Sequence, residues 1–259
     1  MVSHGPLRVY SGVMTTSTAL PEEVAKFSAL ADQWWDPQGP FRPLHKLNPA
    51  RLLFIRDRLA AHFGRDVETR MPFKGLTLLD IGCGGGLTAE PMARLGFRVT
   101  AIDASEENVG VARVHAERMD LDITYEAATP EQLMARGVKF DAVLALEVVE
   151  HVTDVDAFLA ASAACVGADG AFVTATLNRT LKSLALGKIA AEYILRWVPA
   201  GTHDWRKFVR PSELARGLRR AGLDLQKMEG VHYDVMTDRW RLGPDLDVNY
   251  MAYAKKAAA

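Results

Sequence analysis

The feature that most constrains the fold is a buried-strand pattern that runs directly into a glycine-rich turn. Residues 76–81 read as a mostly apolar strand, and the turn 82–86 that follows has the sequence Gly-Cys-Gly-Gly-Gly. A helix pattern over 88–95 comes next. Glycine lets a backbone turn tightly and approach a ligand closely, so this order predicts a cofactor site between a strand and a helix.

Strand and helix patterns alternate along most of the remaining chain. Further strands are predicted at 97–102, 123–127, 140–146 and 170–177, and further helices at 105–119, 154–166 and 211–221. Such alternation forms right-handed crossovers, which build a parallel sheet with helices on both faces. Strand-like pieces over 223–253 add an antiparallel edge, and helices at 21–33 and 49–63 precede the sheet. The predicted fold class is α/β, a Rossmann-like, seven-stranded, mostly parallel sheet with an antiparallel edge strand.

Composition permits one large domain or two small ones, and the sparse cysteines fit a reducing compartment. The chain has 259 residues, of which 49% are hydrophobic and 24% charged, and these values are typical of globular proteins. We expect a flexible arm over 1–20 and a single domain over 21–259. Cys83 and Cys165 lie far apart and predict no disulfide framework. No apolar run is long enough to span a bilayer, so we expect a cytoplasmic protein.

The spacing of the glycine turn favours S-adenosylmethionine (SAM) over a dinucleotide. Dinucleotide sites have GxGxxG, whereas this turn reads GxGxG. Gly82 and Gly84 are therefore expected beside SAM, and Asp103, at the end of the next strand, beside its ribose hydroxyls. Asp80 either supports the turn or attracts the ammonium group. A nicotinamide-dependent oxidoreductase is the competing class, but the spacing and the lack of a Tyr-x-x-x-Lys pair argue against it.

The fourth predicted strand leads into three ionisable residues, Glu147, Glu150 and His151. Two carboxylates and an imidazole suit Mg, Mn or Zn, which would acidify a phenolic hydroxyl. Alternatively, His151 acts as a general base, because its reference pKa of about 6.5 suits that role. A third possibility is that the carboxylates are solvated or cap the next helix while His151 packs under the cofactor.

Short motifs along the chain resemble the ubiquinone-biosynthesis O-methyltransferases, a family of class I SAM-dependent methyltransferases. The motifs WWD, NPARL, LEVVEHV, TLNRT, EYILR, GTHDW and DVNYM occur in this order between residues 27 and 253. The resemblance implies two O-methylations, of 2-polyprenyl-6-hydroxyphenol to 2-methoxy-6-polyprenylphenol and of 3-demethylubiquinol to ubiquinol.

The resemblance also implies specific roles for individual residues. It implies SAM contacts at Arg51, Gly82, Asp103 and Leu146, although relatives have Met where this chain has Leu146. It further implies a divalent metal site and catalytic roles at the three residues Glu147, Glu150 and His151.

The family's insert corresponds to residues 178–201, which we expect to form a helical lid. The stretch 176–220 carries ten Lys or Arg and only three Asp or Glu. A basic, apolar lid suits a polyprenyl substrate held in a membrane with anionic lipids, and this would place the protein peripherally at the inner membrane. A lid that simply packs over the site is the other interpretation. Alternative functions are methylation of other lipophilic small molecules and a non-catalytic, SAM-binding role in a biosynthetic complex.

Overall fold

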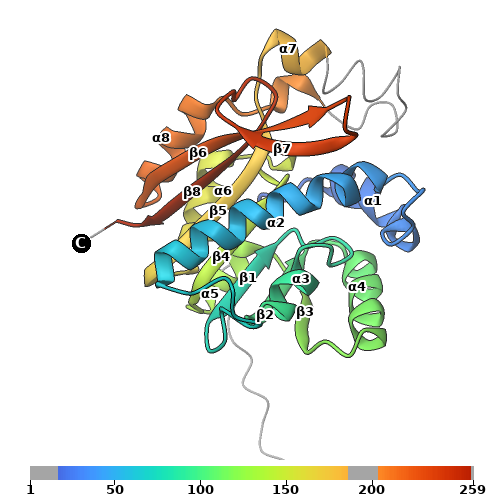
Figure 1. The fold of residues 1–259 in the computed structure, drawn as a ribbon, viewed down its shortest axis with the longest axis vertical. Coiled ribbons are helices and arrows are strands. Elements are labelled where there is room, and N and C mark those ends of the chain that lie inside the picture. Colours follow the sequence, from blue (N-terminus) through green and yellow to red (C-terminus); the bar gives the residue numbers. More distant parts are fainter. Residues whose placement is uncertain (1–16, 186–203, 258–259) are drawn as a thin grey trace, which may run out of the picture.

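A computed structural model describes residues 17–185 and 204–257, which build one mixed sheet of eight strands (Figure 1). The strand order is β3-β2-β1-β4-β5-β8-β6-β7. The strands are β1 (Thr77–Ile81), β2 (Arg98–Asp103), β3 (Ile123–Ala127), β4 (Phe140–Leu146), β5 (Val166–Leu177), β6 (Leu223–Asp234), β7 (Arg239–Gly243) and β8 (Asn249–Lys256).

The sheet confirms the predicted α/β class and adds one strand to it. β1 to β5 are parallel, β8 is antiparallel to both β5 and β6, and β6 forms an antiparallel hairpin with β7. The sequence predicted seven strands because the tail was divided into two pieces. The tail instead forms three strands, since the turn after Asp234 reverses the chain within it.

Helices cover both faces of the sheet. They are α1 (Pro21–Ser28), α2 (Arg42–Phe63), α3 (Ala89–Arg94), α4 (Glu106–Arg118), α5 (Pro130–Ala135), α6 (Val155–Ala164), α7 (Leu181–Ser183) and α8 (Pro211–Arg220), with short 3-10 turns η1 (Ala31–Gln33), η2 (Val149–His151) and η4 (Trp205–Lys207). Ser105 caps α4, because its hydroxyl accepts a hydrogen bond from the Asn108 N–H at 3.1 Å. α2 begins seven residues before the predicted start, since Pro43 rather than Pro49 occupies its first turn.

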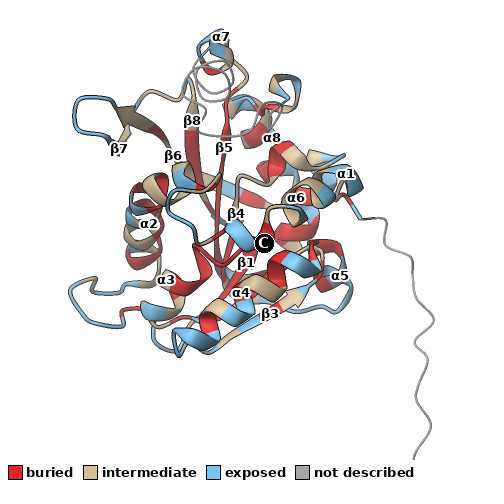
Figure 2. Cartoon of the chain, turned by 90° about the vertical axis from the view of Figure 1, so that its right-hand side faces the viewer, coloured by how far each residue is buried: buried red, intermediate tan, exposed pale blue. Residues whose placement is uncertain are grey.

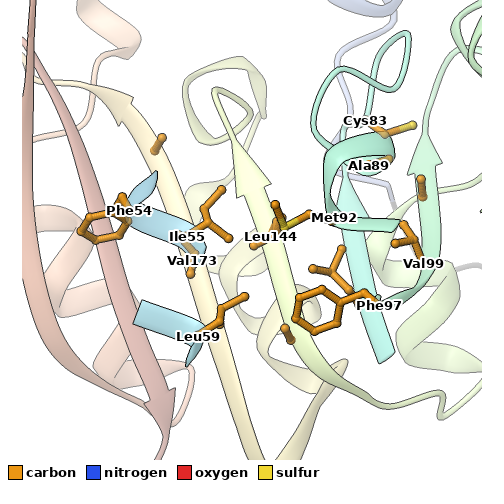
Figure 3. Close-up of a cluster of buried hydrophobic side chains, with 14 of the residues drawn as sticks. Phe54, Ile55, Leu59, Cys83, Ala89, Met92, Phe97, Val99, Leu144 and Val173 are labelled. Carbon is orange, nitrogen blue, oxygen red and sulfur yellow. The ribbon is translucent and has the colours of Figure 1, made fainter. Parts of the chain in front are cut away.

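Alternating side chains of the central strands form two cores. Leu144 of β4 and Val173 of β5 face the core beneath α2, whereas their neighbours Val143 and Phe172 face the core beneath α6 and α8. Figure 3 shows the first core, in which Phe54, Ile55 and Leu59 of α2 meet these strands. Figure 2 shows that the buried strands lie between the two helical layers.

The last residues of the predicted N-terminal arm are fixed in place. Thr18 is buried, and its N–H and hydroxyl donate hydrogen bonds to Glu131 Oε1 at 3.3 and 2.6 Å. Ala19 forms an isolated bridge with Val152. Thr18 and Ala19 thus contact the domain, and the flexible arm over 1–20 stays a prediction. Residues 1–16 lie outside the described part of the chain.

Within residues 17–185 and 204–257, no helix combines the length and apolarity needed to cross a bilayer. Most of the predicted lid, 186–201, lies outside these residues. Its described beginning is α7, where the Thr180 hydroxyl accepts a hydrogen bond from the Ser183 N–H.

Candidate active site

A cavity of about 750 Å³ opens at the carboxyl ends of the parallel strands. Its wall includes the residues that follow β1, β2 and β4, which is where ligands bind in sheets of this kind. Five of the predicted cofactor residues line it, namely Arg51, Gly82, Gly84, Asp103 and Leu146. The structure therefore brings the residues predicted from separate strands to one site.

The glycine turn is packed against a tryptophan from the N-terminal segment. Gly84 has a φ of +53°, and a Cβ there would lie 2.4 Å from the Trp34 ring. A Cβ on Gly85 would lie 2.4 Å from the Trp34 Cβ, and the Gly85 carbonyl accepts a hydrogen bond from Trp35 Nε1 at 2.9 Å. Glycine is thus required both for the turn and for the approach of these tryptophans.

Asp103 holds the turn and faces the cavity. Its carboxylate accepts hydrogen bonds from the N–H groups of Gly84 and Ser105, both at 2.9 Å, and from Asn108 Nδ2 at 3.3 Å. Burial raises its pKa, and these hydrogen bonds lower it. A carboxylate has about four acceptor positions, so Asp103 retains room for about one further donor.

Asp80 has a buried oxygen, Oδ2, with no hydrogen-bond partner among the described residues. The pKa of this carboxyl is raised to about 7, mainly by burial and also by the nearby charge of Asp103, while Arg51 opposes both effects. Because Asp80 lines the cavity, a cationic group there would satisfy the oxygen and stabilise its charge.

Arg51 and Glu147 form a largely buried ion pair inside the cavity wall. Arg51 lies on α2 and is only 5% exposed, and its Nη2 lies 2.9 Å from Glu147 Oε1. Glu147 has a φ of +55°, a left-handed conformation that is rare for residues other than glycine, asparagine and aspartate. Strained backbone of this kind concentrates at functional sites.

Glu150 points away from the cavity into the protein interior. It is 3% exposed, and its Oε2 accepts a hydrogen bond from the Thr176 hydroxyl of β5 at 2.8 Å. Its pKa is raised to about 7, mainly by burial and also by the charge of Glu147. Glu150 is absent from the cavity wall, whereas Glu147 and His151 are part of it.

His151 is held by α1. Its Nδ1 lies 3.1 Å from Glu23 Oε2, and its ring packs edge-on against Phe27 with 5.4 Å between centroids. Burial lowers the pKa of His151, but the carboxylates of Glu23, Glu150 and Glu147 outweigh burial, so the pKa is raised. His151 is therefore a cavity residue with one ring nitrogen fixed by a carboxylate.

The three residues predicted to hold a metal do not converge in this arrangement. Glu147 pairs with Arg51, Glu150 with Thr176, and His151 with Glu23. Across the described ranges, no group of three or more His, Cys, Asp or Glu side chains is placed to hold a metal ion. The metal site at these three residues stays a prediction.

Sequence reasoning missed Glu23 and Trp34 as site residues. Both come from the segment before the sheet, where the strand and helix patterns give no information about the cavity. The WWD motif was the available signal for Trp34, because paired tryptophans next to a turn are unusual on a surface. Glu23 had no signal beyond its helix pattern.

The chain is similar in sequence to known methyltransferases. A family described as "Methyltransferase domain" matches residues 47–227. The chain is 55% identical over 239 residues to the ubiquinone biosynthesis O-methyltransferase of Paramagnetospirillum magneticum, covering 92% of this chain and 96% of that protein. It is 56% identical over 237 residues to the protein of the same name from Caulobacter vibrioides, covering 91% and 94%.

Solved structures share the fold. The magnesium protoporphyrin IX methyltransferase of Synechocystis with bound SAM aligns with a TM-score of 0.61 at 17% identity, covering 93% of this chain and 100% of that chain. The same enzyme with bound SAH aligns with a TM-score of 0.59 at 20% identity, covering 90% and 94%.

Proposed function

The chain belongs to the ubiquinone biosynthesis O-methyltransferases, and from this premise we propose that it methylates polyprenyl phenols in both O-methylation steps of ubiquinone formation. It is a SAM-dependent O-methyltransferase. The two substrates are 2-polyprenyl-6-hydroxyphenol and 3-demethylubiquinol, and in both a ring hydroxyl receives the methyl group.

One observation carries the proposal, namely that a single cavity joins the glycine turn to His151. Gly82, Gly84 and Asp103 line the cavity beside the ends of β1 and β2. Glu147 and His151 line it beyond the end of β4. A cofactor held at the turn and a phenol held near His151 would therefore share one enclosed space. Positioning of two reactants in this way supplies much of the catalysis in a displacement reaction.

The residues around the turn fit SAM. The unpartnered Asp80 Oδ2 suits its ammonium group, and Asp103 suits a ribose hydroxyl. Arg51 suits its carboxylate, and binding would then require Arg51 to share its guanidinium between this carboxylate and Glu147. When bound, SAM supplies an electrophilic methyl group.

His151 is the proposed general base. A phenol has a pKa near 10 and is a poor nucleophile while protonated at neutral pH. With Glu23 accepting a hydrogen bond from Nδ1–H, the neutral imidazole carries its basic lone pair on Nε2. That nitrogen would accept the phenolic proton. Glu147 holds Arg51 through their ion pair. Glu150 connects η2 to β5, because it accepts a hydrogen bond from the Thr176 hydroxyl.

Turnover of a short-chain demethylubiquinol with SAM tests the proposal. Methylation of the ring hydroxyl is expected, with tight binding of SAH and none of NAD measured by calorimetry. Turnover without SAH inhibition, or NAD binding without SAH binding, would contradict the assignment of SAM as the cofactor. Binding of SAH with no methylation of either phenol would favour a non-catalytic, SAM-binding subunit.

A divalent cation at Glu147, Glu150 and His151 is a separate prediction. It requires Glu147 and Glu150 to leave their present partners and turn toward His151. Chelation and Glu150→Ala should then each reduce turnover while SAH affinity changes little. Equal turnover with and without chelator would remove the metal from the reaction.

Contact with anionic lipids is proposed from the charge excess of residues 176–220. Binding to anionic vesicles should weaken as salt is raised, and equal binding to neutral vesicles would contradict it. Contact with other enzymes of the same biosynthesis rests on the function alone.

A further inference from the structure

The β6–β7 hairpin extends past the edge of the sheet that carries the candidate active site. β6 runs parallel to β1–β5, because it is antiparallel to β8 and β8 is antiparallel to β5. Pairing of β6 with β8 ends at Val231, opposite Asn249, whereas pairing with β7 continues to Asp234. The hairpin therefore reaches beyond the carboxyl ends of the parallel strands, and Figure 2 shows it standing out from the body of the molecule.

One face of this hairpin is apolar. Side chains alternate between the two faces of a strand, so Val231 and Tyr233 share a face with the residues opposite them, Leu242 and Trp240. Val231, Trp240 and Leu242 belong to or pack against the core that contains α2, and Figure 1 shows the hairpin lying alongside that helix. The other face of the hairpin is mainly polar and includes Asp234, Arg239 and Arg241.

The apolar face of the hairpin and the start of α2 form two sides of one passage from the cavity. Pro43, Asn48 and Arg51 of α2 and His232 of the hairpin also line the cavity, but the passage is formed by Leu44 and Leu47 of α2 together with Val231, Tyr233, Val235 and Trp240 of the hairpin. We call these six residues the tail channel. Val231 is 3% exposed and Val235 is 78% exposed, so the channel runs from the interior to the surface. At 3.3 Å per residue, Val231 and Val235 lie about 13 Å apart.

An ion pair and a hydrogen bond to Asp238 connect the two sides of the tail channel. Lys46 of α2 pairs with Asp238 in the hairpin turn at 2.6 Å, and Asp238 also accepts a hydrogen bond from the Tyr233 hydroxyl. The channel is thus tied at its outer end, beside Val235 and the 94% exposed Met236.

We infer that the tail channel holds the first part of the substrate's polyprenyl tail while the ring hydroxyl lies at His151. This inference rests on the proposed function. A prenyl chain has no polar groups, and its transfer from water onto apolar side chains is favourable. The exposed tip is then explained, because the tail passes Val235 as it leaves the protein.

The test compares two substrates that share a ring. One is a demethylubiquinol with several isoprene units, and the other carries a methyl group in place of the tail. Trp240→Ala and Val235→Asp are expected to lower the ratio of kcat/KM for the tailed over the tailless substrate by about tenfold. Thr237→Asp places the same charge on the same turn without lining the cavity, so its ratio should equal that of the unaltered protein.

SAH affinity and thermal unfolding show whether Trp240→Ala folds, and Val235→Asp changes an exposed residue that the fold does not need. An unchanged ratio in both variants, or an equal fall in Thr237→Asp, would overturn the tail channel. Absence of methylation of either substrate by the unaltered protein would overturn the proposed function instead, and the tail channel with it.

Discussion

Asp80 is the residue whose surroundings are least complete without a ligand. It is the last but one residue of β1, and one of its oxygens is buried with no hydrogen-bond partner in the described part of the chain. A buried carboxylate without a partner takes up a proton, which is why burial raises its pKa to about 7. An ammonium group beside it would reverse this effect by favouring the ionised form.

We predict that SAH binds more tightly as the pH rises from about 6 to about 8. Below its pKa of about 7, Asp80 must lose a proton before it can pair with the ammonium group, so affinity should rise by up to about tenfold per pH unit and then level off. Calorimetry in buffers of different ionisation enthalpy would detect the released proton. Asp80→Asn should bind SAH more weakly, without the pH dependence, and the same slope in this variant would contradict the assignment.

Gly84 is required by its surroundings, whereas Gly110 occupies a helix position that other residues could fill. A Cβ on Gly84 would meet Trp34 at 2.4 Å at a φ of +53°, whereas a Cβ on Gly110 in α4 would meet nothing within 4 Å. We predict that Gly84→Ala lowers the free energy of unfolding by about 1–3 kcal/mol and weakens SAH binding. Gly110→Ala should instead stabilise the protein by up to about 1 kcal/mol. Denaturant unfolding of both variants tests this, and equal effects would show that Trp34 can move aside.

At the scale of elements, the N-terminal segment acts as part of the site. Trp34, directly after η1, donates a hydrogen bond through Nε1 to Asn108 Oδ1 of α4 at 2.9 Å. Asn108 in turn donates to Asp103. The position of η1 is therefore linked through one amide to the carboxylate expected at the ribose.

We predict that Trp34→Phe destabilises the protein by about 1–3 kcal/mol and weakens SAH binding, because Asn108 Oδ1 is left buried without its donor. Trp205→Phe is the matched control, since Trp205 Nε1 donates to the Thr180 carbonyl in a more exposed setting. It should cost less stability and leave SAH affinity unchanged. The idea fails if both variants bind SAH equally well.

Elements with a clear pattern could be predicted from the sequence to the residue. β3 and β4 match their predicted bounds, because polar or turn residues flank each of them. α5 was missed because its six residues are too few to show a helical period, although Thr129 caps it. The tail was divided into too few strands because the chain reverses after Asp234, where no glycine or proline marks a turn, whereas Gly230 lies inside β6.

The sequence predicted which residues meet at the site where the order of the strands determines their positions. It did not predict the contacts that depend on the direction of a side chain. Residues at strand ends must meet at one edge, so Gly82, Asp103 and Glu147 could be grouped in advance. Glu150 and His151 are neighbours in the short turn η2, and only the turn's geometry sends one to Thr176 and the other to the cavity. The contacts of Glu23 and Trp34 are long-range and have no local pattern.

At the scale of the whole molecule, several buried ionisable groups give stability a common dependence on pH. The pKa values of Asp80 and Glu150 are raised to about 7, mainly by burial. The folded protein therefore keeps protons that the unfolded chain loses above about pH 4, so their contribution is complete below that pH and is lost as the pH rises to about 7. The raised pKa of His151 acts in the same direction at higher pH.

Glu23 acts in the opposite direction, because its hydrogen bond to His151 lowers its pKa to about 2, against the effect of burial. Its contribution is present above about pH 4.5 and is lost as the pH falls toward 2. We therefore predict that the ligand-free protein is most stable near pH 4 and loses a few kcal/mol of unfolding free energy by pH 8. Denaturant unfolding at a series of pH values measures this.

The variants Asp80→Asn and Glu150→Gln should each flatten the decline of stability with pH. Saturating SAH should remove only the part that comes from Asp80, because the ammonium group of SAH stabilises the ionised carboxylate. A profile that rises from pH 5 to pH 8 would mean that water or a bound cation reaches these carboxylates in solution.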